Sequence, residues 1–97
     1  MSSEFDLVAE RTLILVEAAS GARREIKIQI GKPYWTEAGV EAACPVAILG
    51  LLERRDDIRG VDLVNAIESA LKFVQQYLSG REPDVQVCWA DGEPYFD

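Results

Sequence analysis

The sequence predicts an α+β fold of two layers, in which one long helix packs on one face of a mainly antiparallel sheet of about four strands. Three observations predict it: a period-two strand pattern at 24–30, a helical stripe of apolar residues over 63–78, and a second alternating stretch at 85–89. The sheet and the helix each have one apolar side, and packing them together buries both. The 97 residues are expected to form a single domain, with 1–9 and 91–97 less ordered.

The first two strands are expected to form an antiparallel hairpin. Residues 12–16 are aliphatic, and the small residues of 18–23 are typical of a turn. In 24–30, isoleucine alternates with polar residues, which indicates a strand with one buried face and one solvated face. Gly31 and Pro33 end this strand, because proline cannot donate a hydrogen bond to a neighbouring strand.

A loop over 34–43 is expected to lead into a third strand within 45–52. This strand is almost entirely apolar, so we expect it either at the centre of the sheet or covered on both faces. Pro45 fixes its start directly after Cys44. Gly50 permits a bend, or the close approach of another backbone.

A single long helix is predicted from residue 63 to about residue 79. Asp62 is expected to be its N-cap, because its carboxylate can accept hydrogen bonds from the free N–H groups of the first turn. The charged segment 53–60 is expected to be a loop in which Gly60 shapes the start of the helix. Gly80 is expected at the C′ position, just after the last turn.

A fourth strand at 85–89 completes the order β-β-β-α-β, and we expect Trp89 to lie in the core. The isoleucines of the second strand are expected to contact Ile67, Leu71 and Val74 of the helix. The opposite face of the sheet must then be solvated or covered by a partner. A core of this size also leaves homodimer formation open.

The composition excludes several classes of function. The formal net charge is -7, from 10 Lys and Arg against 17 Asp and Glu. Nucleic-acid binding is disfavoured, because phosphate contacts need an excess of positive charge. The absence of histidine excludes His-dependent nucleophilic catalysis and His-ligated zinc. The sequence has no secretory signal and no apolar run near the roughly 20 residues that span a bilayer, so we expect a cytoplasmic protein.

The two cysteines are interpreted as buried small hydrophobic residues with reduced thiols. A bridge between Cys44 and Cys88 and a reactive thiol stay open as alternatives. We find no complete phosphate-binding loop, metal-ligand set or acid–base pair. We therefore predict no catalytic residue, no metal site and no cofactor.

The candidate partner surface contains Tyr34, Trp35, Arg54 and Arg55. Tyrosine, tryptophan and arginine dominate the residues that carry binding energy in protein interfaces. The two aromatic residues lie in the segment expected to be a loop, and the two arginines lie in the charged segment before the helix. Structural roles are expected for the other residues singled out: Gly31, Pro33, Cys44, Pro45, Gly50, Gly60, Asp62 and Gly80.

Four short motifs follow one another along the chain: Ile28-x-Ile30-Gly31-Lys32-Pro33, Cys44-Pro45-x-x-Ile48-x-Gly50-Leu51, Ile58-x-Gly60-Val61-Asp62 and Ala66-x-x-x-Ala70-Leu71. In this order and spacing they resemble a group of small bacterial proteins catalogued only as a domain of unknown function. The resemblance covers roughly residues 11–80. That family often has a glutamine in the helix where this chain has Asn65. The resemblance implies the same order of elements and a bacterial cytosolic origin, and it implies no activity.

We therefore expect a non-enzymatic protein-interaction module that binds one partner through the open sheet face and the 32–41 loop. Its more specific form is an immunity-type inhibitor, in which a small acidic protein occludes a basic toxin domain. Two alternatives stay open. One is a homodimeric structural or accessory domain whose free sheet face pairs with itself. The other is a small-ligand binder with a pocket between helix and sheet, near Trp35 and Trp89.

Overall fold

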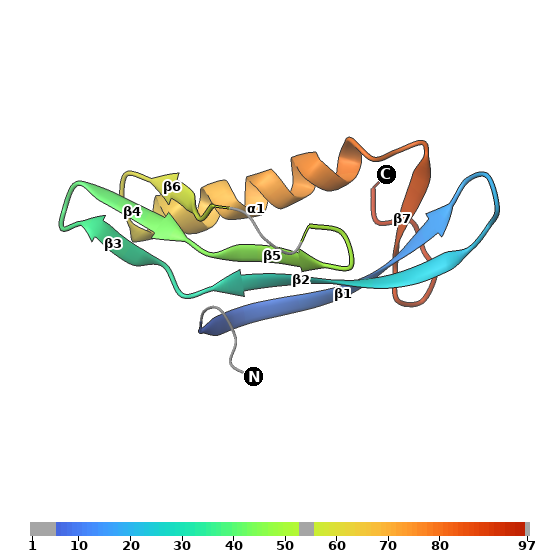
Figure 1. Cartoon of the computed structure of the whole chain (residues 1–97), viewed down its shortest axis with the longest axis horizontal. Helices are drawn as coiled ribbons and strands as arrows, with labels where there is room; N and C mark the ends of the chain where they lie inside the picture. The colour runs from blue at the N-terminus through green and yellow to red at the C-terminus, as the bar shows by residue number, and fades with distance from the viewer. Residues whose placement is uncertain (1–5, 53–55, 97) are drawn as a thin grey trace.

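The computed structural model describes residues 6–52 and 56–96, and within these ranges the chain forms two antiparallel sheets and one long helix (Figure 1). The α+β class is therefore confirmed. The elements, in chain order, are β1 (Leu7–Glu17), β2 (Arg23–Gly31), β3 (Tyr34–Glu37), β4 (Glu41–Cys44), β5 (Val46–Leu49), β6 (Ile58–Gly60), α1 (Leu63–Ser79) and β7 (Val85–Trp89).

The larger sheet has the strand order β5-β2-β1-β7. The predicted hairpin forms its centre, with Leu13 of β1 opposite Ile26 of β2. The predicted third strand is shorter than expected and lies at the edge of this sheet, where Ile48 pairs with Ile28. It is nevertheless buried on both faces, since Ala47 and Ile48, which point to opposite sides, are 6% and 0% exposed.

The second sheet, β3-β4-β6, occupies segments that the sequence analysis expected to be loops. Residues 34–43 form the hairpin of β3 and β4, and residues 58–60 add the third strand. These strands have three or four residues each, too few for a period-two pattern to stand out. The chain passes from β4 of the second sheet to β5 of the larger sheet at Pro45. The apolar run on either side of Pro45 therefore forms one strand in each sheet.

The helix α1 lies along one side of both sheets (Figure 1). As predicted, it begins after Asp62, whose side chain accepts a 2.7 Å hydrogen bond from the Asn65 N–H. Gly80 follows the last helical residue, but its φ of −69° is right-handed rather than the left-handed value typical of C′. The carbonyl groups at the end of the helix instead accept hydrogen bonds within successive turns. The Gly80 N–H donates to the Gln76 carbonyl, and the Arg81 N–H donates to the Leu78 carbonyl.

The core lies between α1 and the sheets. Its fully buried side chains come from every layer, with Leu13 and Leu15 of β1, Ile26 of β2 and Leu78 of α1 all at most 1% exposed. Val74 belongs to the same buried cluster as the isoleucines of β2, and Ile67 packs against that cluster, in line with the predicted packing of helix on sheet. Leu71 differs, because it is 48% exposed and borders a groove rather than the core.

Two glycines permit close approach of backbones, as expected. At Gly60, a Cβ would lie 2.5 Å from the Ala66 nitrogen, so β6 can pack on the first turn of α1 only without a side chain there. Gly50 has a φ of +98°, and a Cβ would lie 3.3 Å from the Glu25 carbonyl oxygen. Close packing of the backbone accounts for the glycine at both positions.

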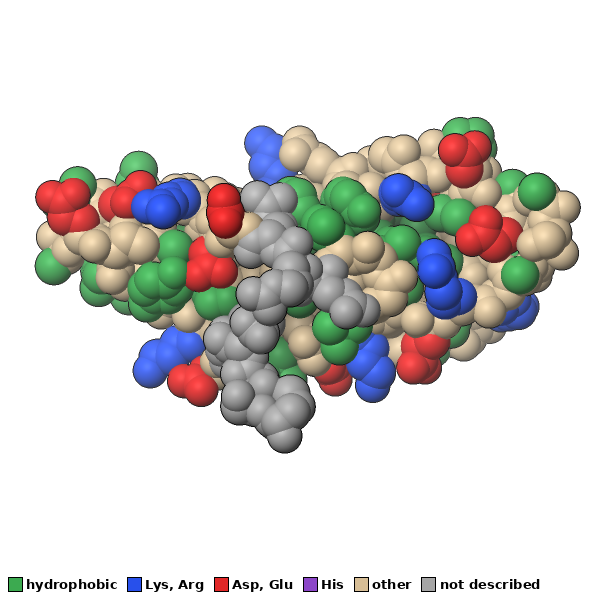
Figure 2. Space-filling model, in the orientation of Figure 1, with side chains coloured by type: hydrophobic (Ala, Val, Ile, Leu, Met, Phe, Trp, Pro, Cys, Tyr) green, Lys and Arg blue, Asp and Glu red, His purple; other side chains and the backbone are tan. Residues whose placement is uncertain are grey.

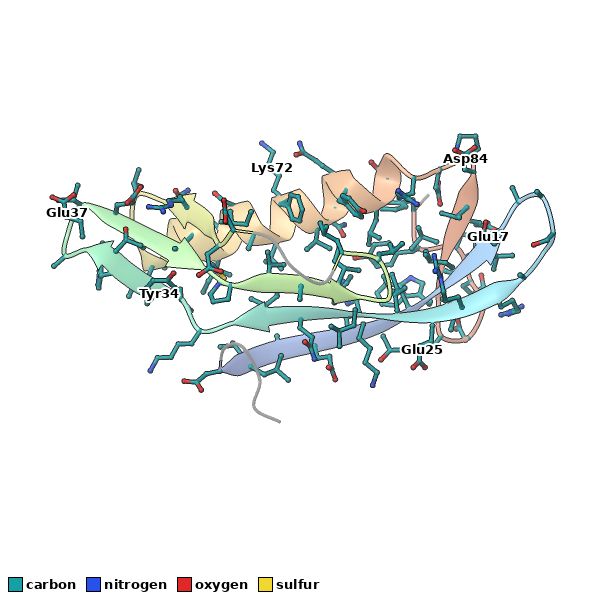
Figure 3. All side chains as sticks on the ribbon, viewed as in Figure 1. Glu17, Glu25, Tyr34, Glu37, Lys72 and Asp84 are labelled. Atoms are coloured by element: carbon teal, nitrogen blue, oxygen red, sulfur yellow. The ribbon has the colours of Figure 1, made fainter. Side chains whose placement is uncertain are left out.

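The face of the larger sheet opposite α1 carries polar side chains. Gln29 Nε2 donates a 2.7 Å hydrogen bond to Glu10 Oε2 across β2 and β1. Figure 3 shows Glu25 pointing away from the helix on this side, and Lys72 pointing from α1 away from the sheets. The polar residues of the period-two pattern therefore lie where the sequence predicted them.

Candidate functional site

The predicted partner surface is only partly described by the structure. Tyr34 and Trp35 are neighbours on β3, 45% and 41% exposed, while Arg54 and Arg55 lie outside the described residues. Adjacent strand residues point to opposite faces, so the two aromatic side chains do not form one patch. The Tyr34 hydroxyl donates a 2.5 Å hydrogen bond to Asp57 Oδ2, and this bond is the main cause of the raised Tyr34 pKa.

A polar cluster joins the strands of the second sheet beside Tyr34. Thr36 Oγ1 and Arg59 Nη1 donate to Glu41 Oε1 over 2.7 and 2.8 Å. These partners, Thr36 first, lower the pKa of the Glu41 carboxyl below its usual value. Figure 2 shows acidic side chains gathered at this end of the molecule. Such exposed pairs contribute little to stability, and we assign them the role of holding the hairpin to β6.

Both cysteines are buried and free, in agreement with their interpretation as small hydrophobic residues. The Cys44 thiol donates weakly to the Gly31 carbonyl over 3.5 Å. Burial, followed by the nearby charge of Asp57, raises the pKa of the Cys44 thiol to about 11. This thiol is therefore protonated at neutral pH, which argues against the reactive-thiol alternative there.

A groove of about 330 Å³ lies between β1 and the second half of α1, and we call it the β1–α1 groove. Ile28 and Ile30 of β2 contribute apolar side chains to its lining, and α1 contributes Leu71 and Gln75. It is the feature that comes nearest to the pocket expected between helix and sheet. It borders Arg11 and Tyr95, which pack on Trp89, and it does not include Trp35.

Beside this groove, half of β1 has a free edge. β7 pairs with β1 only at 13–17, and among the described residues no strand pairs with that side of β1 over 7–12 (Figure 1). The Glu17 N–H donates to the Ala22 carbonyl, toward β2, and the Ala18 N–H donates to Asp84, toward β7. Because antiparallel strands alternate these directions, the N–H and C=O of Glu10 point to the free edge, while those of Thr12 face the end of β7, next to the last pair Leu13–Trp89.

Arg11 lies where the free edge meets the C-terminal segment. Its Nη1 donates a 2.8 Å hydrogen bond to the Tyr95 hydroxyl, which itself donates to Gln75 Oε1 over 2.7 Å. The guanidinium carbon lies 5.1 Å from the ring centre of Trp89 and 5.8 Å from that of Tyr95. Aromatic contacts thus hold the arginine side chain in place. Because it is already ordered, it would lose little conformational entropy when a partner binds.

The C-terminal segment positions Tyr95. It runs along the outer side of β7, where the Trp89 N–H donates to the Glu93 carbonyl and the Tyr95 N–H donates to Val87. The Trp89 and Tyr95 rings meet edge to face with their centres 4.8 Å apart. Trp89 is 39% exposed, so the expectation that it belongs to the core is wrong. The physical reason is that Trp89 is the last residue of β7, an edge strand. The chain turns back directly after it, so its ring stays at the surface.

Sequence reasoning did not select Arg11, Gln75 or Tyr95 as site residues. A signal for Arg11 was present, because period two places it on the same face as Leu13 and Leu15, which are both fully buried. A cation on an otherwise apolar face calls for a specific partner. That partner is Tyr95, which lies 84 positions further along the chain and could not be found from local patterns.

The structure defines a two-layer α+β protein with an apolar groove beside a free strand edge and an arginine at the end of that groove. The chain belongs to the family described as a domain of unknown function, DUF6968, whose model matches residues 9–95. Comparisons with curated proteins and with solved structures gave no match.

Two further findings concern the described part of the chain. No group of three or more Cys, Asp and Glu side chains within 6–52 and 56–96 is arranged to hold a metal ion. The helix in these ranges lacks the length and hydrophobicity needed to cross a membrane.

Proposed function

We propose that this protein is an interaction module that binds an extended segment of a protein partner by adding it as a strand to the free edge of β1. The observation that carries this proposal is the outward N–H and C=O pair of Glu10 beside the β1–α1 groove. In strand addition, main-chain hydrogen bonds supply affinity, and side-chain pockets supply specificity.

Exposed apolar residues around the edge support the proposal. Leu7 and Val8 at the start of β1 are 50% and 58% exposed, and Leu71 on the other wall of the groove is 48% exposed. Proteins usually block a free edge with proline, inward charges or a covering segment, because such edges bind other chains. Arg11 is an inward charge at this edge, but its side chain is held by Tyr95 and Trp89. A β-bulge between Leu7 and Ala9 interrupts only the beginning of this edge.

The net charge supports a partner that is basic as a whole. A charge of -7 speeds the encounter with a cationic protein through long-range attraction. An immunity-type inhibitor of a basic toxin domain is the specific form of the proposal that fits this charge. In that form, the edge of β1 would bind an extended segment of the toxin domain.

A small-ligand site in the same groove is a second candidate, favoured by the volume of about 330 Å³, which is at the lower end for ligand pockets. Arg11 would then bind an anionic group. The two functions differ in their need for the backbone of β1, because only an added strand uses the Glu10 N–H. The experiment below separates them on that basis.

The test selects peptides from a random display library and measures their affinity for two variants. Glu10→Pro removes the outward N–H, and Glu10→Gln keeps it while removing the same charge. We expect the selected peptides to bind the glutamine variant at least about tenfold more tightly than the proline variant, since several main-chain hydrogen bonds depend on this position. Thermal unfolding checks that both variants are folded before their affinities are compared. Equal binding, or no enriched peptide, would overturn the proposal.

A further inference from the structure

We infer that the partner segment carries a carboxylate side chain opposite Arg11, a basic side chain opposite Glu10 and an apolar side chain opposite Ala9. This inference rests on the proposed strand addition and adds the chemistry of the partner. In an antiparallel arrangement the segment reads acidic, basic, apolar from its N-terminus. We commit to the antiparallel direction, because every strand pair in both sheets is antiparallel.

The carboxylate position follows from Arg11. This guanidinium is exposed, and within the described residues one of its five N–H donors makes a hydrogen bond, to Tyr95. No ion pair to Arg11 occurs among the described residues. Directly opposite side chains of an antiparallel pair lie about 5 Å apart at Cβ, within reach of a guanidinium–carboxylate contact.

The apolar position follows from Ala9, two residues earlier on the same face of β1. Its small side chain lines the groove together with Ile28 and Ile30 of β2 and Leu71 of α1. An incoming leucine or isoleucine opposite Ala9 would extend over these side chains. The two groove-facing positions of the partner are then separated by one residue, as the period of a strand requires.

The basic position follows from Glu10, which points to the opposite face of the sheet. Its carboxylate accepts one hydrogen bond, from Gln29, and is exposed. Opposite charges directly across a strand pair are stabilising, and like charges are destabilising. A lysine or arginine between the acidic and apolar residues therefore fits the outer side of the added strand.

The same charges disfavour two of the registers in which β1 could pair with a second copy of itself. When two copies of β1 pair antiparallel about a two-fold axis, opposing residues have side chains on the same face of the sheet. An even-numbered residue therefore faces an even-numbered residue, and an odd-numbered residue faces an odd-numbered one. Centring the pair on Glu10 places two glutamates face to face, and centring it on Arg11 places two arginines face to face. We therefore propose a different chain as the occupant of this edge. The homodimer of the sequence analysis would use the open face of the sheet, which is a different surface.

The test compares two synthetic peptides of equal composition and charge. The first, acetyl-Thr-Glu-Lys-Leu-Thr-Val-Thr-amide, places its acidic, basic and apolar residues opposite Arg11, Glu10 and Ala9. The second exchanges the glutamate and the lysine. Affinities are measured from the amide signals of ¹⁵N-labelled protein. We expect the first peptide to bind at least about fivefold more tightly, since two attractive pairs replace two repulsive pairs.

Two variants test the assignment of the charges. Arg11→Glu combined with Glu10→Lys should reverse the preference between the peptides. Lys72→Gln removes one cation from the far side of α1 and should leave the preference unchanged (Figure 3). Because the peptides differ only in the order of two residues, a general loss of affinity in a variant does not change their ratio.

Each outcome decides one claim. A preference that is present in the parent protein and reversed in the charge-exchanged variant supports the inference. Equal binding of both peptides by the parent protein overturns the charge pattern but leaves strand addition standing, provided that the Glu10 signal moves. Absence of binding by both peptides overturns the inference, and the display experiment then decides the proposed function by itself.

Discussion

The hydroxyl of Tyr95 accepts a hydrogen bond from Arg11 of β1 at 2.8 Å and donates one to Gln75 of α1 at 2.7 Å. One side chain of the C-terminal segment thus joins the free edge of the sheet to the helix. It closes one end of the β1–α1 groove and holds the arginine in the position that our proposal requires. This contact combines a stabilising role with a role in recognition.

Tyr95→Phe removes both hydrogen bonds of the hydroxyl and keeps the ring contacts with Trp89. We expect the free energy of unfolding to fall by about 1 kcal/mol, the usual net contribution of such bonds. Tyr77→Phe is the matched control, because its hydroxyl makes no hydrogen bond with the described residues, and we expect a change within about 0.5 kcal/mol. Denaturant titration measures both values. Equal effects of the two substitutions would contradict the role given to Tyr95.

Gly60→Ala is expected to destabilise the fold by about 1–3 kcal/mol, because the new methyl group would overlap the backbone at Ala66. The control is Gly80→Ala. At Gly80 the backbone is right-handed and the nearest atom to a Cβ is the Gln76 oxygen at 3.3 Å, so we expect a change of about a few tenths of a kcal/mol. Chemical denaturation of both variants checks this. A Gly60 variant as stable as the parent protein would contradict the packing of β6 on α1.

Asn65 takes part in two hydrogen bonds that cap the start of the helix, one through its backbone and one through its side chain. Its N–H donates to Asp62, and its Oδ1 accepts a 2.9 Å hydrogen bond from the Val61 N–H. This is a variant of the capping box, in which the third helical residue is usually glutamate or glutamine. Asp62→Ala should lower the free energy of unfolding by about 1 kcal/mol.

Asn65→Ala should lower stability in the same direction, while Asn65→Gln keeps an amide that can bind the same N–H and should cost less. A comparison of the two by thermal unfolding checks this. Asn65→Gln as destabilising as Asn65→Ala would show that the side chain acts in some way other than capping.

The pKa of Cys44 predicts how stability depends on alkaline pH. In the folded protein the pKa of its thiol is raised from 9.0 to about 11. A raised folded-state pKa contributes stability that is fully present below pH 9 and is lost as pH rises toward 11. A shift of two pKa units corresponds to a decrease of about 2–3 kcal/mol in the free energy of unfolding. Unfolding measured from pH 8 to 11 should show a shallower loss for Cys44→Ala than for the parent protein.

Thiol labelling gives an independent check of the same environment. At pH 8, Cys44 in the folded protein should react with an alkylating reagent much more slowly than the same residue in denaturant, because it is protonated and fully buried. Rapid labelling of Cys44 in the folded protein would contradict both its burial and its raised pKa.

The elements with strong local signals were predictable from the sequence. The isoleucine alternation of β2 and the long apolar stripe of α1 carry their own periodicity, and Asp62 is a local capping signal. The second sheet was missed, since strands as short as β6 depend on tertiary pairing rather than on pattern. Leu71 was assigned to the core because the helical stripe does not reveal which part of α1 extends past the sheet.

The candidate site was less accessible to sequence reasoning. Tyr34 and Trp35 were selected for residue type, but their side chains lie on opposite faces of β3. The free edge of β1 depends on where β7 stops pairing, and the position of Arg11 depends on Tyr95. Such relationships arise only when distant segments are brought together.

Amide hydrogen exchange at Glu10 tests the central claim most directly. In the free protein this amide should exchange rapidly, because it points to the open edge of β1, while the Arg11 amide, directed toward β2, exchanges slowly. The peptide that places its glutamate opposite Arg11 should slow exchange at Glu10. Slow exchange there in the free protein, or rapid exchange that a bound peptide leaves unchanged, would contradict strand addition at this edge.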